Sequence, residues 1–400
     1  MDNIPFHHRR LEPLILQDLE EKMVFVAGPR QCGKTTLSKH ILEVKSGAYY
    51  NWDNDSDRKK ILNSQLNESA KLWVFDELHK YRRWRNWLKG IFDVHRDEHA
   101  ILVTGSAKLD VYRRGGDSLQ GRYYFYRLHP FTLAEYLMLP IRDPYTDVPS
   151  LPQAVPEQAQ DALERFFIRG NFPEPLFALS ERKAARWRLT YSSRLVREDI
   201  QSVEGINDLD KLELLFERLP ACVGSVLSIN SLREDLEVSF ITVKKWIQVL
   251  EKFYGCFRVP PYGNARIKAV KKEQKLYMWD YGYVENESAR FENLIAVHLL
   301  RLVHWLEDVE GEKAELRYFR SVRGHEVDFV LLRKGKPWMA IEVKLDDRPL
   351  DPNLRYFLER ESIPYAFQIS LKGKLDYRVP DINGAKIRIM PAALFLVNLP

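Results

Sequence analysis

The sequence contains few cysteines and no long apolar run. Its three cysteines, Cys32, Cys222 and Cys256, are odd in number and widely spaced, which argues against a disulfide framework and against a CxxC metal site. A run of about 18 uninterrupted apolar residues, as a membrane helix needs, is absent, and the N-terminus lacks the charged-then-apolar layout of a signal peptide. We therefore expect a soluble, cytoplasmic protein with no membrane partner.

The chain also has little excess of charge and no repeats. Its 61 basic and 56 acidic residues give a formal charge of +5, which is too small to indicate a nucleic-acid partner by itself. Core material is plentiful, because 45% of the 400 residues are hydrophobic and 29% are charged. At roughly 100 to 200 residues per domain, this length predicts two or three domains, and we expect three.

Patterns along the chain predict a multidomain α/β fold. In residues 1–140, strand-like runs such as MVFVAG, LWVFDE and AILVTGS alternate with helical patterns, which is typical of a parallel sheet. Five prolines between residues 139 and 156 indicate a linker. Helical patterns fill most of residues 157–275, and strands and helices alternate again in residues 276–400. We expect the domains to be 1–140, 157–275 and 276–400.

A phosphate-binding loop stands directly after the first strand. The octet GPRQCGKT matches GxxxxGK[ST], and a helix is expected to follow it. Its glycines, Gly28 and Gly33, permit a tight loop in which backbone N–H groups face phosphate oxygens, and the helix dipole favours the anion. Lys34 is expected to reach the β and γ phosphates of ATP, Thr35 to hold Mg²⁺, and Thr36 to complete the nucleotide-binding residues. The alternative is a merely structural glycine-rich turn.

Two acids end the apolar run LWVFDE, as expected of a buried parallel strand that delivers its carboxyl end to the ligand crevice. Asp76 is the expected Mg²⁺ ligand, and Glu77 is placed to polarise the attacking water. The alternative is an ordinary strand end with solvated acids. The next strand ends in Thr104-Gly105-Ser106, which predicts either a hydroxyl that senses the γ-phosphate or a simple turn.

The motifs GPRQCGKTTL, VFDELHK, VTGSAKLD and SLQGRYYFYRLHPFTLAEYL resemble those of AAA-type ATPases of bacteria and archaea. In that family a winged-helix middle region follows, and then an uncharacterised C-terminal domain of restriction-endonuclease-like, PD-(D/E)xK, type. The resemblance implies a homo-oligomer with ATP sites at subunit interfaces, where Arg122 matches an arginine finger. The alternative for Arg122 is a charged edge residue of the strand RYYFYRL. Cys32 departs from the family's usual small aliphatic residue, and we expect no loss of nucleotide binding from a thiol of similar size.

The middle segment has helix-turn-helix dimensions. Residues 231–236 form a first helix, and a second helix is expected over residues 239–253. One face of the second helix is apolar at helical spacing and is expected to pack inward. Its residues are Phe240, Val243, Ile247, Leu250 and Tyr254. The outward face carries Thr242, Lys244, Lys245, Gln248 and Lys252. The family resemblance supports a winged helix here.

The stretch from residue 244 to residue 275 is the most basic part of the chain. Nine basic residues stand against two acidic ones, Glu251 and Glu273, for a net charge of +7. The nine are Lys244, Lys245, Lys252, Arg258, Arg266, Lys268, Lys271, Lys272 and Lys275. Because Lys and Arg contacts to phosphate carry no sequence information, the stretch predicts binding of DNA or RNA and not recognition of a particular sequence. The alternative is an internal lid or a protein contact.

Acidic residues and a lysine mark a candidate nuclease site in the C-terminal segment. Asp328 lies in EVDFVLL, Glu342 and Lys344 end MAIEVK, and the short turn between the two runs predicts a hairpin that brings them to one edge. Asp328 and Glu342 are expected to hold Mg²⁺ or Mn²⁺, with Lys344 orienting the nucleophile and Glu292 completing the ligands. Glu326 competes for the metal role. The alternatives are nucleic-acid binding without cleavage and solvated strand-end charges.

The ten histidines are scattered along the chain, and the pair His7-His8 near the N-terminus predicts no zinc site. Taken together, the motifs predict an ATP-hydrolysing protein that acts on DNA, with metal-dependent cleavage by its C-terminal domain. The rival hypothesis is an ATP-controlled regulatory switch that assembles with protein partners and cuts no nucleic acid. A small-molecule kinase is disfavoured, because it leaves two further domains without a role.

Overall fold

The computed structural model describes residues 7–105, 109, 119–151, 156–201, 206, 208–263 and 274–400. The chain divides into two compact units. Unit 1 comprises residues 1–131 together with Lys252–Tyr254, and unit 2 comprises the rest of the chain from Thr132 to Pro400. The expected middle and C-terminal segments therefore share one compact unit, and their separation into two domains stays a prediction.

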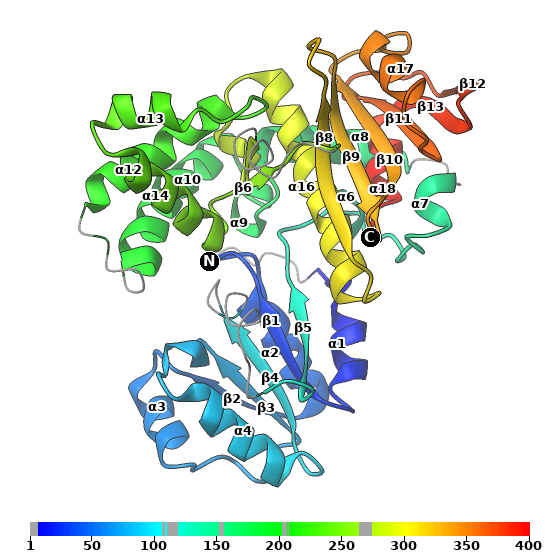
Figure 1. Cartoon of the computed structure of the whole chain (residues 1–400). Helices are drawn as coiled ribbons and strands as arrows, with labels where there is room; N and C mark the ends of the chain where they lie inside the picture. The colour runs from blue at the N-terminus through cyan, green and yellow to red at the C-terminus, as the bar shows by residue number, and fades with distance from the viewer. Residues whose placement is uncertain are drawn as a thin grey trace. The chain divides into compact units, whose positions relative to one another are not determined.

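Unit 1 is a parallel sheet with helices, as its alternating pattern predicts (Figure 1). Its strands are β1 (Met23–Ala27), β2 (Ala48–Asn51), β3 (Leu72–Asp76), β4 (Ala100–Gly105) and β5 (Tyr123–Arg127). Its helices are α1 (Glu12–Asp18), α2 (Lys34–Lys45), α3 (Asp55–Leu62) and α4 (Trp84–His95), with a 3₁₀ turn η1 (Leu78–Lys80). Every residue of β1 and β3 is buried, which explains their continuous apolar runs, since both faces of a parallel sheet are covered.

Strand order places the loop and the acid pair at one edge of this sheet. The order is β2-β3-β4-β1-β5, and all neighbouring pairs are parallel. Asp76 of β3 is in register with Thr104 of β4, and Gly105 of β4 is in register with Ala27 of β1. The phosphate-binding loop follows Ala27 directly. The carboxyl ends of three adjacent strands therefore meet at one edge of the sheet, which is the edge where ligands bind in open α/β sheets.

The first half of unit 2 is helical. Its elements are α6 (Leu133–Tyr136), α7 (Asp147–Ser150), α8 (Ala159–Arg169), α9 (Pro173–Leu176), α10 (Glu181–Arg194), the π-helical η2 (Leu195–Ile200), α12 (Leu209–Arg218), the 3₁₀ turn η3 (Leu219–Cys222), α13 (Ile229–Leu236) and α14 (Phe240–Lys252). Helices α13 and α14 occupy the expected helix-turn-helix. Phe240 does not pack inward as expected but is 44% exposed, because it opens α14 ahead of the buried face that begins at Val243 and includes Trp246.

A two-stranded antiparallel sheet follows α14, so the middle segment is not purely helical. It pairs β6 (Cys256–Val259) with β7 (Lys275–Met278). Residues 264–273, which include Arg266, Lys268, Lys271 and Lys272 of the basic stretch, lie outside the described residues. A strand pair directly after a helix-turn-helix is the arrangement that a wing requires, and the winged helix itself stays a prediction.

The second half of unit 2 is a six-stranded mixed sheet with helices (Figure 1). Its strands are β8 (Ala314–Arg320), β9 (Glu326–Arg333), β10 (Lys336–Lys344), β11 (Tyr365–Ser370), β12 (Tyr377–Ile382) and β13 (Ala385–Pro391), and its helices are α16 (Glu287–Asp308), α17 (Pro352–Leu358) and α18 (Ala392–Val397), preceded by the 3₁₀ turn η4 (Tyr281–Tyr283). The order is β12-β13-β11-β10-β9-β8. Strands β9 and β10 form the expected hairpin, which turns at Lys334 and Gly335, both with positive φ as a tight two-residue turn requires.

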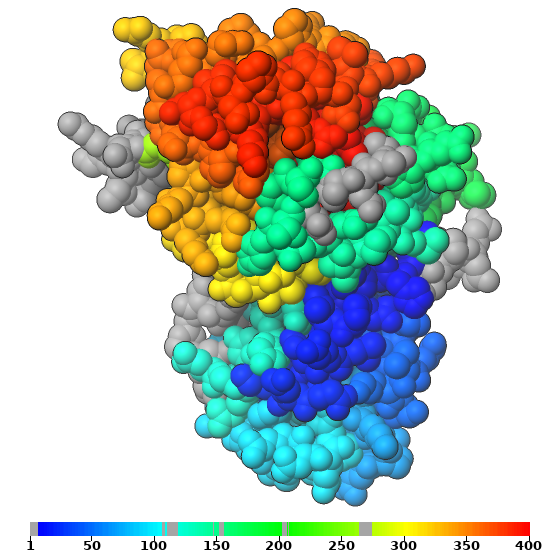
Figure 2. Space-filling model, turned by 90° about the vertical axis from the view of Figure 1, so that its right-hand side faces the viewer, coloured from blue at the N-terminus to red at the C-terminus, as the bar shows by residue number. Residues whose placement is uncertain are grey.

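Helices α16 and α18 pack against the six-stranded sheet of unit 2. Helix α16 contacts β8, β9 and β10, and α18 contacts α6 and α8, so the first and last segments of unit 2 lie side by side, in teal and red in Figure 2. His298 of α16 also contacts the first segment, because its Nε2 accepts a hydrogen bond from the N–H of Leu133 at 3.3 Å. Among the described helices, none combines the length and the apolar character that a membrane span needs.

Candidate nucleotide site and acidic cluster

The phosphate-binding loop has the backbone shape that its glycines predict. Gly33 has a φ of 103°, in the left-handed region that side chains disfavour. A Cβ on Gly28 would lie 2.3 Å from the carbonyl oxygen of Leu128, so only glycine fits there. The Nζ of Lys34 lies inside the loop, where it donates to the carbonyl oxygens of Gly28 at 2.9 Å and Pro29 at 2.7 Å. The lysine is therefore held within the loop, and its contact with phosphate stays a prediction.

Asp76 is the centre of a hydroxyl network at the carboxyl edge of the sheet. Its Oδ2 accepts from Thr35 Oγ1 at 2.9 Å and from the Tyr49 hydroxyl at 2.5 Å, and its Oδ1 accepts from Thr104 Oγ1 at 2.6 Å. Burial and the bond to Asp76 raise the pKa of Tyr49, which keeps the phenol a donor. The network joins the two expected Mg²⁺ ligands, Thr35 and Asp76. Sequence reasoning missed Tyr49, whose only signal is its place in the strand-like run AYYNW.

The hydroxyl of Thr104 contacts the carboxylate of Asp76. This bond helps to orient that carboxylate, and the role of Thr104 as a γ-phosphate sensor stays a prediction. Ser106, the other hydroxyl of that motif, lies outside the described residues. Thr36 is exposed in the first turn of α2.

Glu77 stands in a strained backbone position beside the network. Its φ is 58°, in the left-handed region that is uncommon for residues other than glycine, and its N–H donates to the carbonyl of Thr104 at 2.9 Å. Its Oε2 lies 3.3 Å from Lys80 Nζ and 3.6 Å from His79 Nε2, and Lys80 also pairs with Asp53 at 2.6 Å. Burial raises the pKa of Glu77, although the nearby Lys80 and Lys34 ammonium groups lower it. A carboxylate with a raised pKa is a better proton acceptor.

Arg122 lies at the opposite edge of the sheet from the loop. It immediately precedes β5, which runs parallel to β1, whereas the loop follows β1. Its Nε and Nη2 bond to Asp93 at 2.7 and 3.2 Å. The structure therefore does not bring Arg122 to the phosphate-binding loop of its own unit. Both the finger on a neighbouring subunit and the charged edge residue are compatible with this position.

Arg9 supports the loop from the N-terminal segment, and no sequence motif indicated it. Its Nη1 donates to the carbonyl of Cys32 at 2.9 Å, and its Nη2 donates to the carbonyl of His129. Cys32 is fully buried, with its thiol 3.4 Å from the carbonyl of Leu128. The loop is thus braced by a buried arginine that precedes the first helix.

In unit 2 the expected nuclease residues converge from three elements. Asp328 lies on β9, Glu342 and Lys344 on β10, and Glu292 on α16. The N–H of Val343 donates to Asp328 Oδ2 at 2.9 Å, which joins the two strands of the hairpin. Lys344 Nζ lies 2.7 Å from Glu342 Oε1 and 2.7 Å from Oδ2 of Asp351, a residue that the sequence did not single out.

Lys275 occupies the middle of this acidic cluster, which corrects its assignment to the nucleic-acid-binding stretch. It is 1% exposed, so phosphate cannot reach it. Its Nζ lies 3.0 Å from Glu292 Oε1, 2.6 Å from Glu326 Oε1 and 3.8 Å from Asp328 Oδ1. A lysine in the interior needs paired charge, and these three carboxylates supply it. Glu326 is therefore engaged with Lys275.

The cluster has strongly perturbed electrostatics. Burial, together with the charge of Asp328, raises the pKa of Glu292 to about 7 and raises the pKa of Glu342 well above its usual value. Burial likewise raises the pKa of Asp328, against the lowering effect of Lys275. Buried carboxyl groups that repel one another are common at functional sites, although structural ion-pair networks also produce them.

The donors of the cluster suit a hard cation in their chemistry. Carboxylate oxygens are the ligands that Mg²⁺ and Mn²⁺ prefer, and Glu342 Oε2 is buried with no hydrogen-bond partner among the described residues. Glu292, Asp328 and Glu342 are the residues that would hold such an ion. The ammonium of Lys275 already balances two of these three carboxylates, so Lys275 would have to shift before they could serve as ligands.

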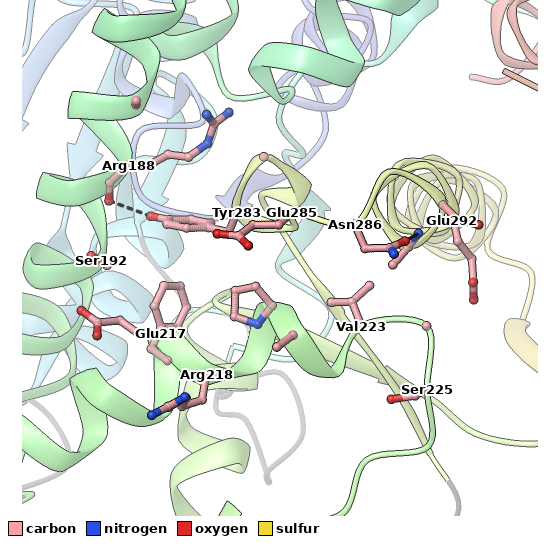
Figure 3. Close-up of a pocket in the computed structure, with 18 of the residues that line it drawn as sticks. Arg188, Ser192, Glu217, Arg218, Val223, Ser225, Tyr283, Glu285, Asn286 and Glu292 are labelled. Carbon is pink, nitrogen blue, oxygen red and sulfur yellow. Dashed lines mark hydrogen bonds between the residues drawn. The ribbon is translucent and has the colours of Figure 1, made fainter. Parts of the chain in front are cut away.

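A cavity of about 1120 Å³ opens beside Glu292, between α10, the α12–η3 segment and the start of α16 (Figure 3). Its charged lining residues are Arg188, Glu217, Arg218, Glu285 and Glu292. Arg188 is neutralised by Asp280, whose Oδ2 lies 2.8 Å from its Nε. The carboxylates in the lining outnumber the arginines, so the cavity by itself is a poor receptor for phosphate.

The described part of the basic stretch offers less free charge than its composition suggests. Arg258 forms a two-bond pair with Glu251, at 2.7 and 2.6 Å. Lys275 is buried in the acidic cluster. Lys244 and Lys245 are exposed on α14, as expected of an outward face.

Comparison with known proteins assigns part of the chain. Residues 20–137 match the family model of an AAA domain, and residues 160–289 and 287–390 match two domains of unknown function, DUF8612 and DUF4143. The uncharacterized protein Rv2008c of Mycobacterium tuberculosis is 23% identical over 336 residues, which cover 82% of this chain and 71% of that protein. The uncharacterized protein MJ1637 of Methanocaldococcus jannaschii is 25% identical over 297 residues, with coverage of 65% and 61%.

Among solved structures, the Walker-type ATPase PABY2304 of Pyrococcus abyssi is similar to 71% of this chain over 96% of its own, at 13% identity and a TM-score of 0.44. The assignment of the N-terminal part depends instead on the family match together with the loop geometry and the Asp76 network. Residues 20–137 thus match an AAA domain, and their parallel sheet with helices fits the N-terminal domain of a P-loop ATPase.

Proposed function

We propose that unit 1 binds ATP with Mg²⁺ and hydrolyses it. The observation that carries this proposal is the direct bond between Thr35 and Asp76, beside a loop that already surrounds the Lys34 ammonium. The backbone amides of the loop and Lys34 would bind the phosphates, and Thr35 and Asp76 would hold the Mg²⁺ that balances their charge.

Glu77 would orient the attacking water and accept its proton. Its raised pKa and its place next to Asp76 suit that role. In the state described, its carboxylate is engaged with Lys80 and His79. Hydrolysis therefore requires Glu77 to turn away from Lys80, and this contact is one that nucleotide binding can break.

We further propose that unit 2 acts on DNA and that its acidic cluster is a metal-dependent nuclease site. The support is the convergence of Glu292, Asp328, Glu342 and Lys344 from α16 and the β9–β10 hairpin. When bound there, a divalent ion would activate water and neutralise the scissile phosphate. Lys344 would orient the nucleophile, and α14 would supply exposed lysines to the DNA backbone.

A second candidate function is an ATP-controlled switch that assembles with protein partners. The position of Lys275 favours it, because a buried ammonium that already neutralises the cluster stabilises unit 2 without any metal. The cavity beside Glu292 favours it too, since its lining is not basic. In this case the cluster is a structural ion-pair network.

Three variants compared with the wild type separate these functions. Lys34→Ala should abolish ATP binding, whereas Glu77→Gln should retain binding and lower turnover by about 10²-fold or more, the usual size of general-base catalysis. Asp328→Ala should leave ATPase activity intact and abolish Mn²⁺-dependent DNA cleavage. If wild-type protein hydrolyses ATP but neither binds DNA at low salt nor cuts it, the switch is the correct function. Wild-type protein that takes up no ATP in a calorimeter would overturn the proposal for unit 1.

A further inference from the structure

Two histidines and a buried glutamate meet between the first two helices of unit 1. His8 precedes α1, Glu12 opens α1, and His40 lies on α2, the helix that follows the phosphate-binding loop. The Nδ1 of His8 lies 3.2 Å from Glu12 Oε2, and the Nδ1 of His40 lies 2.8 Å from Glu12 Oε1. The two rings approach edge to face with centroids 5.2 Å apart.

The geometry of these three residues is that of a metal ligand set. One potential ligand atom of each residue lies within 4.8 Å of the other two. The Glu12 side chain is 8% exposed and presents one oxygen to each ring, while the His8 side chain is 70% exposed. Two imidazoles and one carboxylate with an open side toward solvent form a ligand set found in four-coordinate Zn²⁺ sites, where a water occupies the fourth position.

A second group, His95, Glu98 and His99, meets the same distance limit but is less suited. The Nδ1 of His99 bonds to the carbonyl of Ala70 at 2.7 Å, and its ring stacks on Trp73 at 4.0 Å. The Glu98 side chain is 75% exposed, so no buried carboxylate fixes the site. In the first group, by contrast, both rings are directed at a carboxylate that the fold holds in place.

We propose that His8, Glu12 and His40 bind a divalent transition-metal ion of the Zn²⁺ class. Imidazole ligands select Zn²⁺, Co²⁺, Ni²⁺ or Cu²⁺ over Mg²⁺, so this site is chemically distinct from the Mg²⁺ that accompanies ATP. The bound ion fastens the N-terminal segment to the helix that carries Lys34 and Thr35. That segment also carries Arg9, whose guanidinium braces the loop at Cys32. The site therefore secures the support of the nucleotide loop, and it does not depend on whether unit 2 cuts DNA.

The test uses the full chain without a histidine tag, stripped of metal by a chelator and kept in excess Mg²⁺. Titration with Co²⁺ should produce visible d–d absorption, which Zn²⁺ should abolish, and calorimetry should show one Zn²⁺ per chain. His8→Ala, His40→Ala and Glu12→Gln should each weaken Zn²⁺ binding by about tenfold or more, since even outer-shell changes reach that size. Zn²⁺ should also raise the unfolding temperature of the wild type.

Two matched variants control for other histidines. His7→Ala removes the neighbour of His8, and His95→Ala removes a ligand of the second group; both should bind Zn²⁺ as the wild type does. His8 is exposed, so His8→Ala tests the site even if a change at His40 disturbs folding. The proposal is overturned if the wild type takes up neither Co²⁺ nor Zn²⁺, or if His8→Ala binds Zn²⁺ with unchanged affinity. Loss of binding in His95→Ala alone would assign the metal to the second group.

Discussion

Lys275 distinguishes the two proposed roles of the acidic cluster in unit 2, a metal site and a structural ion-pair network. Its ammonium balances Glu292, Glu326 and Asp328 in a buried setting. In Lys275→Met these carboxylates lose their counter-charge, and breaking a buried ion pair from one side costs about 3–5 kcal/mol. We expect the free energy of unfolding of unit 2 to fall by about that amount at slightly alkaline pH, as measured by urea denaturation.

If the cluster is a metal site, Mn²⁺ should recover most of that loss, because the ion takes over the role of the ammonium. The double variant Lys275→Met/Asp328→Asn provides the control, since it lacks a ligand and should respond little to Mn²⁺. A Lys275→Met protein that is as stable as the wild type would show that the ammonium is not needed to balance the cluster. A destabilised variant that ignores Mn²⁺ would favour the structural ion-pair network.

We expect His298 to make the stability of unit 2 sensitive to acid. Its Nε2 accepts from the N–H of Leu133, so Nδ1 carries the proton that faces the carbonyl of Leu294 at 2.9 Å. Burial lowers its pKa from 6.5 to about 4. Between these two pH values the unfolded chain binds a proton at His298 that the folded chain does not bind. The contribution of neutral His298 to the free energy of unfolding is therefore complete above pH 6.5 and is lost as the pH falls toward 4.

We expect the loss of stability from His298 in acid to reach about 3 kcal/mol, because folding lowers its pKa from 6.5 to about 4. The measurement is the free energy of unfolding of the wild type and of His298→Gln across this pH range. The variant should be less stable near neutral pH but should show a flatter pH profile. A profile with the same slope in both proteins would assign the acid sensitivity to other groups.

At the scale of elements, the start of α16 positions Glu292. Asn286 caps this helix, and its Oδ1 accepts from the N–H of Ala289 at 3.0 Å. Loss of such a cap costs about 1 kcal/mol, so Asn286→Ala should lower the free energy of unfolding of unit 2 by that amount. Asn286→Asp keeps an acceptor at the cap and should remain near wild type. Equal losses in both variants would mean that the cavity lining at Asn286, rather than the cap, is responsible.

Elements whose signals are local could be predicted from the sequence. The loop before α2 is specified by its two glycines and its lysine, and the β9–β10 hairpin by Lys334-Gly335 between two apolar runs. Both depend on residues that are adjacent in the chain, where backbone preferences act directly. The same holds for Asp76 and Glu77, because the change from an apolar run to two acidic residues marks the end of a buried parallel strand.

Elements whose roles depend on distant partners could not be predicted. Lys275 opens the run KLYMWD, and composition counts it as one more positive charge, because the carboxylates that bury it lie on α16 and β9. Tyr49 looks like an ordinary strand residue until strand order brings β2 beside β3. His8 and His40 are far apart in sequence, and only the packing of α1 on α2 brings them to one carboxylate. Periodicity predicts which side of an element faces inward, but it does not predict which charged residues of other elements that side contacts.

At the scale of the whole molecule, a single copy of unit 1 cannot bring its own Arg122 to its phosphate-binding loop. Lys34 lies at the edge of the sheet where the strands end, whereas Arg122 lies at the edge where they begin and pairs there with Asp93. If Arg122 completes catalysis, it does so for a second copy of the chain, through a head-to-tail contact in which one face meets a different face. We propose a homo-oligomer of this kind. It predicts that two inactive variants restore activity when they are mixed, which the alternative of Arg122 as a charged edge residue does not predict.

Subunits that carry Lys34→Ala and subunits that carry Arg122→Ala should each be inactive alone and active when mixed. Random mixing in equal amounts places an intact Lys34 opposite an intact Arg122 at roughly a quarter of head-to-tail interfaces, so ATPase activity should recover to about that share of the wild type. Replacing the Lys34→Ala partner by the double variant Lys34→Ala/Arg122→Ala should abolish recovery, because no subunit then supplies the arginine. Activity in the first mixture equal to the sum of the separate proteins would leave Arg122 as a surface residue paired with Asp93.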